Sequence, residues 1–182
     1  MEYTLFTIGH IGLSRDEFFQ KLEGNGIRAL IDIRIKSSSY YQPWAGFSVG
    51  YCKSMGYPME KQNEFSIDAL KRKCKKADID YLHIPELGYK KPNREIKTKE
   101  DFDKYIADYR EALDDDTTGV DGCAPLCFFM PECVRPILEG IPTALMGSDN
   151  RWRFCPRHVL AYHINGYISD RYKEYFIDIV HL

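Results

Sequence analysis

A cysteine flanked by arginines is the most chemically suggestive combination in this sequence. Cys155 lies between Arg153 and Arg157, and Pro156 suits the first position of a helix. The free N–H groups at a helix start attract anions and favour the thiolate form of a cysteine placed there. Cys155 is therefore a candidate nucleophile, and Arg157 is a candidate ligand for an anionic substrate. A small buried cysteine with no chemical role is the structural alternative.

A second pair of charged residues ends an apolar, β-branched run. Asp32 and Arg34 follow Ala29-Leu30-Ile31, which is typical of a strand buried on both faces of a parallel sheet. Residues two apart point to the same side of a strand, and open α/β sheets bind ligands at the carboxyl ends of their strands. Asp32 and Arg34 are therefore predicted to bind substrate. A purely structural ion pair explains them equally well.

Other polar residues occupy similar positions. Each follows a predicted strand: His10 after Tyr3–Ile8, Glu86 after Asp80–Ile84, and Glu132 after Leu126–Met130. We expect these residues to converge, because the carboxyl ends of parallel strands lie at one edge of the sheet. His10 is a candidate substrate ligand, and Glu86 or Glu132 is a candidate general acid or base.

Helices are predicted between these strands. Ser14 and Glu17 form a capping-box pattern, and Ser66 and Thr98 are suitable N-caps. A closing strand is predicted over residues 175–181. The 182 residues suffice for one domain with a substantial core. The predicted fold is a single α/β domain over residues 1–182, with a mostly parallel sheet and helices on both faces, as in Rossmann-like three-layer proteins.

An irregular, aromatic-rich insertion interrupts this pattern at about residues 36–64. It contains Tyr40 and Trp44 among several glycines and prolines. Because the segment leaves the end of a predicted strand, these rings are candidates for contacting substrate or for stacking on unpaired bases. Anchoring of a long loop is the structural alternative.

The overall composition excludes several classes of protein. The 25 basic and 27 acidic residues nearly balance, which argues against a protein devoted to neutralising phosphate backbones. No apolar run approaches the roughly 20 residues that span a bilayer, so no membrane association is predicted. The scattered cysteines are expected to be reduced thiols in a cytoplasmic protein. The run Lys71–Lys76 is interpreted as the solvated face of a helix.

Metal binding is not favoured by the spacing of the cysteines and histidines. The candidate ligands for a structural zinc lie late in the chain: Cys123, Cys127, Cys133, Cys155, His158 and His163. They include no Cys-x-x-Cys pair, which most structural zinc sites contain. No metal and no cofactor is therefore predicted.

Three N-terminal motifs together resemble a known family. They are Thr7–His10, Leu30–Arg34 and Tyr81–Gly88, and they are similar to the domain of unknown function 488. That family's pattern continues with a strand ending in Cys and Glu, similar to Cys127 and Glu132. A Cys-His-Arg triplet that opens a helix follows, similar to Cys155–His158 but with Pro156 in place of the histidine, and then a closing strand like Val180-His181. The resemblance implies an α/β fold with a shared site at the strand ends, and it implies no particular reaction.

Three hypotheses for function follow. The first is an enzyme that acts on an anionic or nucleotide-like small substrate at the carboxyl edge of the sheet. The second is a module that processes nucleic acid or binds single strands, through stacking on Tyr40, Tyr41 and Trp44. The third is a non-catalytic structural or partner-binding domain whose charged cluster is only a buried network.

Overall fold

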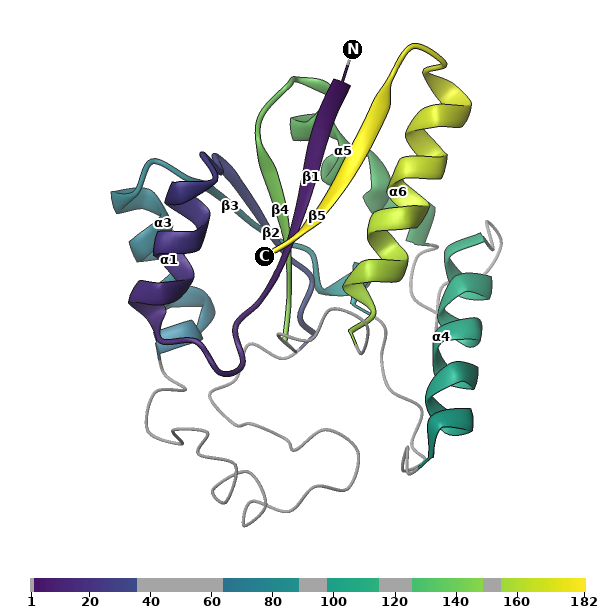
Figure 1. Cartoon of the computed structure of the whole chain (residues 1–182), viewed down its shortest axis with the longest axis horizontal. Helices are drawn as coiled ribbons and strands as arrows, with labels where there is room; N and C mark the ends of the chain where they lie inside the picture. Colours follow the sequence, from purple (N-terminus) through teal and green to yellow (C-terminus); the bar gives the residue numbers. More distant parts are fainter. Residues whose placement is uncertain (1, 36–63, 89–97, 115–125, 149–154) are drawn as a thin grey trace.

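Five parallel strands form one sheet in the computed structural model (Figure 1). The structure describes residues 2–35, 64–88, 98–114, 126–148 and 155–182. The strands are β1 (Glu2–Gly9), β2 (Ala29–Asp32), β3 (Asp80–His83), β4 (Thr143–Gly147) and β5 (Phe176–His181), in the order β3-β2-β4-β1-β5. Every strand pairing is parallel, so all five carboxyl ends lie at one edge of the sheet.

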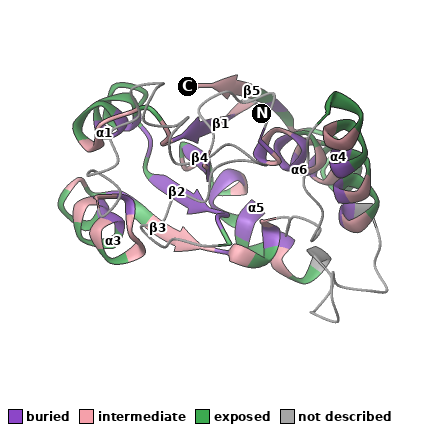
Figure 2. Cartoon of the chain, turned by 90° about the horizontal axis from the view of Figure 1, so that it is seen from below, coloured by how far each residue is buried: buried purple, intermediate pink, exposed green. Residues whose placement is uncertain are grey.

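Helices cover both faces of this sheet, so the predicted α/β architecture is confirmed. On one face, α1 (Arg15–Gly24) and α3 (Ile67–Lys76) pack against residues such as Ile8 and Met146. On the other face, α4 (Lys99–Asp114), α5 (Met130–Leu138) and α6 (Arg157–Arg171) pack against residues such as Ile31 and Leu145. Figure 2 shows the central strands β2 and β4 buried between these two helical layers, whereas the edge strands β3 and β5 are only partly buried.

The predicted N-caps form as expected. The Ser14 N–H donates to Oε2 of Glu17 at 2.7 Å, and the Glu17 N–H donates back to Oγ of Ser14, which completes the capping box. Oγ of Ser66 accepts from the N–H of Ala69 at the start of α3. Oγ1 of Thr98 accepts from the N–H of Asp101 at the start of α4. Local sequence therefore fixes where three helices begin.

The predicted strand over residues 126–130 is wrong. That segment forms the 3₁₀ helix η5 (Leu126–Phe129) and the first turn of α5, where Pro131 occupies a position that tolerates proline. A short apolar run does not by itself distinguish a strand from a buried helix. The strand that was missed is β4, whose five residues are all buried.

The connections between strands locate a topological switch at the end of β4. The helix that follows β4, α6, lies on the opposite face from α1 and α3, which follow the two neighbouring strands β1 and β2. In open α/β sheets, chains that leave adjacent strands toward opposite faces open a crevice, which is the usual place for a ligand. The topology therefore points to Gly147, with the ends of β1 and β2 on either side.

Among the described helices, none combines the length and apolarity needed to cross a bilayer.

Candidate functional site

A buried ion pair lies at the end of β2. Nε of Arg34 donates to Oδ1 of Asp32 at 2.8 Å, and Nη2 donates to Oδ2 at 2.6 Å. Asp32 also accepts the N–H of Arg34 at 3.0 Å and the hydroxyl of Tyr81 at 2.7 Å. Burial opposes ionisation of this carboxyl, but the hydrogen bonds from Arg34 and Tyr81 outweigh that penalty and lower its pKa. Asp32 is therefore a buried carboxylate that orients Arg34.

The guanidinium of Arg34 is fixed but not fully used. Its Nη2 also donates to the carbonyl of Phe65 at 3.0 Å, so Nε and Nη2 are committed to protein acceptors. The hydrogen bonds of this side chain to the described residues all use Nε or Nη2, and none uses Nη1. His83 contributes to the same corner, because its Nε2 donates to the carbonyl of Arg34 at 2.9 Å. The arrangement holds one edge of a guanidinium in place and leaves two N–H groups for another acceptor.

His10 lies between this pair and the end of β4. Its Nδ1 is 3.3 Å from the carbonyl of Gly147, and its ring lies 4.8 Å from that of Phe65. Burial and then the charge of Arg34 lower the pKa of His10 to about 3. Arg34 affects this pKa more than Asp32 does, and Arg157 acts in the same direction as Arg34. The potential of these three charged groups at the imidazole is therefore net positive, and His10 is neutral near pH 7.

The neutral state of His10 gives a prediction about acid sensitivity. Its folded pKa of about 3 lies below the value of about 6.5 for an unfolded chain. Below pH 6.5 the unfolded state therefore binds a proton that the folded state does not, and stability falls with pH by up to about 1.4 kcal/mol per unit. His10→Gln is expected to flatten this slope between pH 6.5 and 4.5, as measured by urea unfolding. Parallel slopes in the variant and the wild type would contradict the assignment.

The start of α6 packs directly onto the end of β4. A Cβ built on Gly147 would lie 2.5 Å from Sγ of Cys155 and 3.1 Å from Cδ of Arg157. Cys155 is 4% exposed and Arg157 is fully buried. Only glycine lets these two side chains approach the backbone of β4 so closely. The helix α6 begins at Arg157, with Pro156 as its N-cap. The sequence placed Pro156 at the first helical position, so the helix begins one residue later than predicted and Cys155 lies just before the N-cap.

Two histidines border this region. Nδ1 of His158 donates to the carbonyl of Cys155 at 2.6 Å, which fixes the backbone at the start of α6. Nδ1 of His181, at the end of β5, lies 2.7 Å from Oγ1 of Thr7. Burial, followed by the charges of Arg157 and His158, lowers the pKa of His181. The last strand therefore also contributes a polar group at the carboxyl edge.

The structure thus brings together five of the predicted site residues. They are His10, Asp32, Arg34, Cys155 and Arg157, linked through hydrogen bonds, electrostatic interaction or close packing around Gly147. Asp32 is the partner of Arg34, whereas the sequence left Asp32, Glu86 and Glu132 as alternatives.

The remaining candidates are not part of this cluster. Glu86 is exposed on the 3₁₀ helix η3 (Pro85–Leu87), and Glu132 is exposed in the first turn of α5, not after a strand. Tyr40 and Trp44 lie outside the described residues, as does nearly all of the predicted insertion at 36–64. Within the described ranges, no group of three or more His, Cys, Asp or Glu side chains is arranged to hold a metal ion.

Three contributors were not predicted from the sequence. Tyr81 and the carbonyl of Phe65 hold the Asp32–Arg34 pair, and Gly147 admits the start of α6. The strand that ends at Gly147 could have been found from the apolar run Ala144-Leu145-Met146, which is bounded by Pro142 and glycine as short buried strands often are. The role of the Phe65 carbonyl could not be predicted, because every residue has a backbone carbonyl.

Comparison with known proteins adds a family but no activity. Residues 56–164 match the model of the domain of unknown function DUF488. This range includes the motif at Tyr81–Gly88, all of β4 and the start of α6. No curated protein and no solved structure matches the chain.

Proposed function

Since the chain belongs to the DUF488 family, whose description records no activity, we propose a function from the geometry: an enzyme that holds an anionic or nucleotide-like small substrate at the carboxyl edge of the sheet. The observation that carries this proposal is the guanidinium of Arg34. Asp32 and Phe65 orient it through Nε and Nη2, and none of its hydrogen bonds to the described residues uses Nη1.

The surrounding charges support an anionic ligand. Arg34 outweighs Asp32 at His10, and Arg157 adds to the positive potential there. An anion at this position would gain charge-assisted hydrogen bonds in a poorly solvated environment, where such bonds are strongest. The imidazole of His10 is neutral near pH 7, so it adds no charge to the site. The topological switch at β4 favours the same location.

Arg34→Lys is expected to weaken binding of a phosphate-bearing ligand by about 1–3 kcal/mol, the range for hydrogen bonds to charged groups. Lysine offers a single ammonium in place of a planar fork, so it cannot bind Asp32 and a ligand along two separate edges. Isothermal titration calorimetry with inorganic phosphate and nucleoside monophosphates would measure the loss.

Tyr81→Phe is the matched control. It removes one hydrogen bond from Asp32 and keeps every N–H of Arg34, so it should lower stability slightly and leave affinity nearly unchanged. If Arg34→Lys binds the ligand as tightly as the wild type, the pair is purely structural and the proposal is wrong.

Within this proposal Cys155 is the nucleophile, and no acid or base is assigned, because Glu86 and Glu132 lie outside the cluster. Burial raises the pKa of Cys74 and of Cys133 to about 12, so their thiols serve as internal references of low reactivity. With iodoacetamide at pH 6.5, Sγ of Cys155 should displace iodide and lose its proton to solvent faster than free cysteine does.

Peptide mapping by mass spectrometry would follow each thiol separately. A rate no faster than that of free cysteine would remove Cys155 as the nucleophile. That result would leave the anion site at Arg34 to be judged by calorimetry. A cytoplasmic location is part of the same proposal, since reduced thiols persist there.

A further inference from the structure

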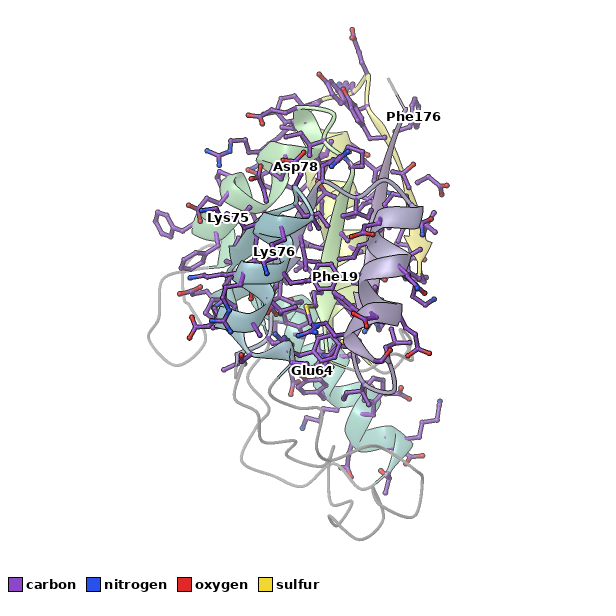
Figure 3. The ribbon with its side chains drawn as sticks, turned by 90° about the vertical axis from the view of Figure 1, so that its left-hand side faces the viewer. Phe19, Glu64, Lys75, Lys76, Asp78 and Phe176 are labelled. Atoms are coloured by element: carbon purple, nitrogen blue, oxygen red, sulfur yellow. The ribbon has the colours of Figure 1, made fainter. Side chains whose placement is uncertain are left out.

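A cationic groove lies between α1 and α3, on the face of the sheet opposite α6. It has a volume of about 240 Å³ and is lined by Arg15, Ala69, Arg72, Lys73 and Lys76. Figure 3 looks onto these two helices and labels Lys76 on α3 and Phe19 on α1. None of these residues belongs to the cluster around Gly147.

The charged side chains that line the groove are all cationic. Four of its five side chains are cationic, the fifth is an alanine, and no carboxylate lines it among the described residues. Lys73 is held in place by the ring of Phe19, whose centre lies 5.5 Å from Nζ. Like charges gathered in one groove repel each other, and an anion bound between them relieves that repulsion.

Arg15 supplies a second, independent observation. Its Nε is buried, yet it has no hydrogen-bond partner in the part of the chain that the structure describes. Buried donors are nearly always paired, so a donor of this kind indicates an acceptor that the described residues do not provide. An oxygen of an anion in the groove would satisfy Nε of Arg15.

The shape of the groove narrows the kind of anion. Ala69, Arg72, Lys73 and Lys76 follow the spacing i, i+3, i+4 and i+7 along α3, so they form one stripe about 10 Å long. The volume is below the range of roughly 300–1,000 Å³ that encloses whole small molecules. A narrow, extended anion fits better than a compact ligand with a base and a sugar.

We propose that the groove between α1 and α3 binds linked phosphate groups, as phosphodiesters or phosphoanhydrides. Arg15 binds at one end of the groove, and Arg72, Lys73 and Lys76 follow the chain of phosphates along α3. The phosphates can belong to a nucleic acid strand or to a short polyphosphate. This site is separate from the cluster around Gly147 and does not depend on its function.

The test compares two double variants of α3 in the full-length chain. Arg72→Gln with Lys76→Gln removes two cations from the groove. Lys71→Gln with Lys75→Gln removes two cations from the same helix that do not line it. The probes are tripolyphosphate, measured by calorimetry, and a fluorescent twelve-nucleotide single strand, measured by anisotropy, both at low salt. Thermal unfolding of each variant verifies that it is folded.

The groove variant should bind at least one probe about tenfold more weakly than the wild type, which is the usual loss for a charge-assisted contact. The control variant should stay within about twofold. Selective loss for tripolyphosphate assigns the groove to short polyphosphates, and selective loss for the oligonucleotide assigns it to a nucleic acid strand. Equal losses in both variants, or no binding of either probe by the wild type, would overturn the proposal. Arg34→Lys should leave binding in the groove unchanged, so failure at one site is distinguishable from failure at the other.

Discussion

Asp32→Ala is expected to lower the free energy of unfolding by about 3–5 kcal/mol, the usual cost of removing one partner of a buried ion pair. The substitution removes both acceptors of the Arg34 guanidinium on that side and leaves a cation that is 7% exposed. It also leaves the hydroxyl of Tyr81 without its partner. Urea unfolding followed by circular dichroism would measure the loss.

Two further variants show whether this loss comes from the stranded charge. Asp32→Ala combined with Arg34→Met removes both charges and should regain much of the stability, because replacing a whole buried pair with apolar groups is often nearly neutral. Arg28→Ala disrupts an exposed pair with Asp78 and should have little effect. If Asp32→Ala were as mild as Arg28→Ala, the pair would not be a buried anchor of this site.

Gly147→Ala is expected to cost about 1–3 kcal/mol, the range for overpacking a core. The added methyl would lie 2.5 Å from Sγ of Cys155, and two atoms of Arg157 lie within 3.3 Å of the same position. Because β4 is buried throughout, the start of α6 has to move, and Cys155 and Arg157 move with it. Thermal unfolding would measure the cost, and alkylation of Cys155 should change at the same time.

Gly166→Ala is the matched control in α6. A Cβ there meets nothing within 4 Å, so alanine should stabilise the helix by about 0.5–1 kcal/mol. If Gly147→Ala behaved like Gly166→Ala, the close packing of α6 on β4 would be disproved.

Local sequence predicted much of the fold because several helices begin at N-cap residues and the central strand is a β-branched run. Ser14, Ser66 and Thr98 begin helices as expected, and the β-branched run before Asp32 forms a buried strand. One strand was missed, β4, and one was wrongly predicted, at residues 126–130, for the same reason. Both segments are short apolar runs, and whether such a run becomes a strand depends on its neighbours in the sheet more than on its own residues.

The clustering of the candidate residues was predictable where it depends on strand ends and not where it depends on packing. Asp32, Arg34 and His10 were found because parallel strands bring their carboxyl ends together. Glu132 was assigned to a strand end that does not exist, so that argument for its role fails. The contribution of Gly147 depends on how α6 approaches β4 across a long separation in sequence, which no local pattern encodes.

An anion bound at Nη1 of Arg34 can be located by anomalous diffraction from crystals grown with selenate. Selenate carries the charge and shape of a phosphate group and is located by its own scattering. We expect an anomalous selenium peak beside Arg34, with selenate oxygens within about 3 Å of Nη1, a hydrogen-bond distance. A peak in the groove between α1 and α3 with none at Arg34, under conditions where the crystal is saturated with selenate, would contradict it.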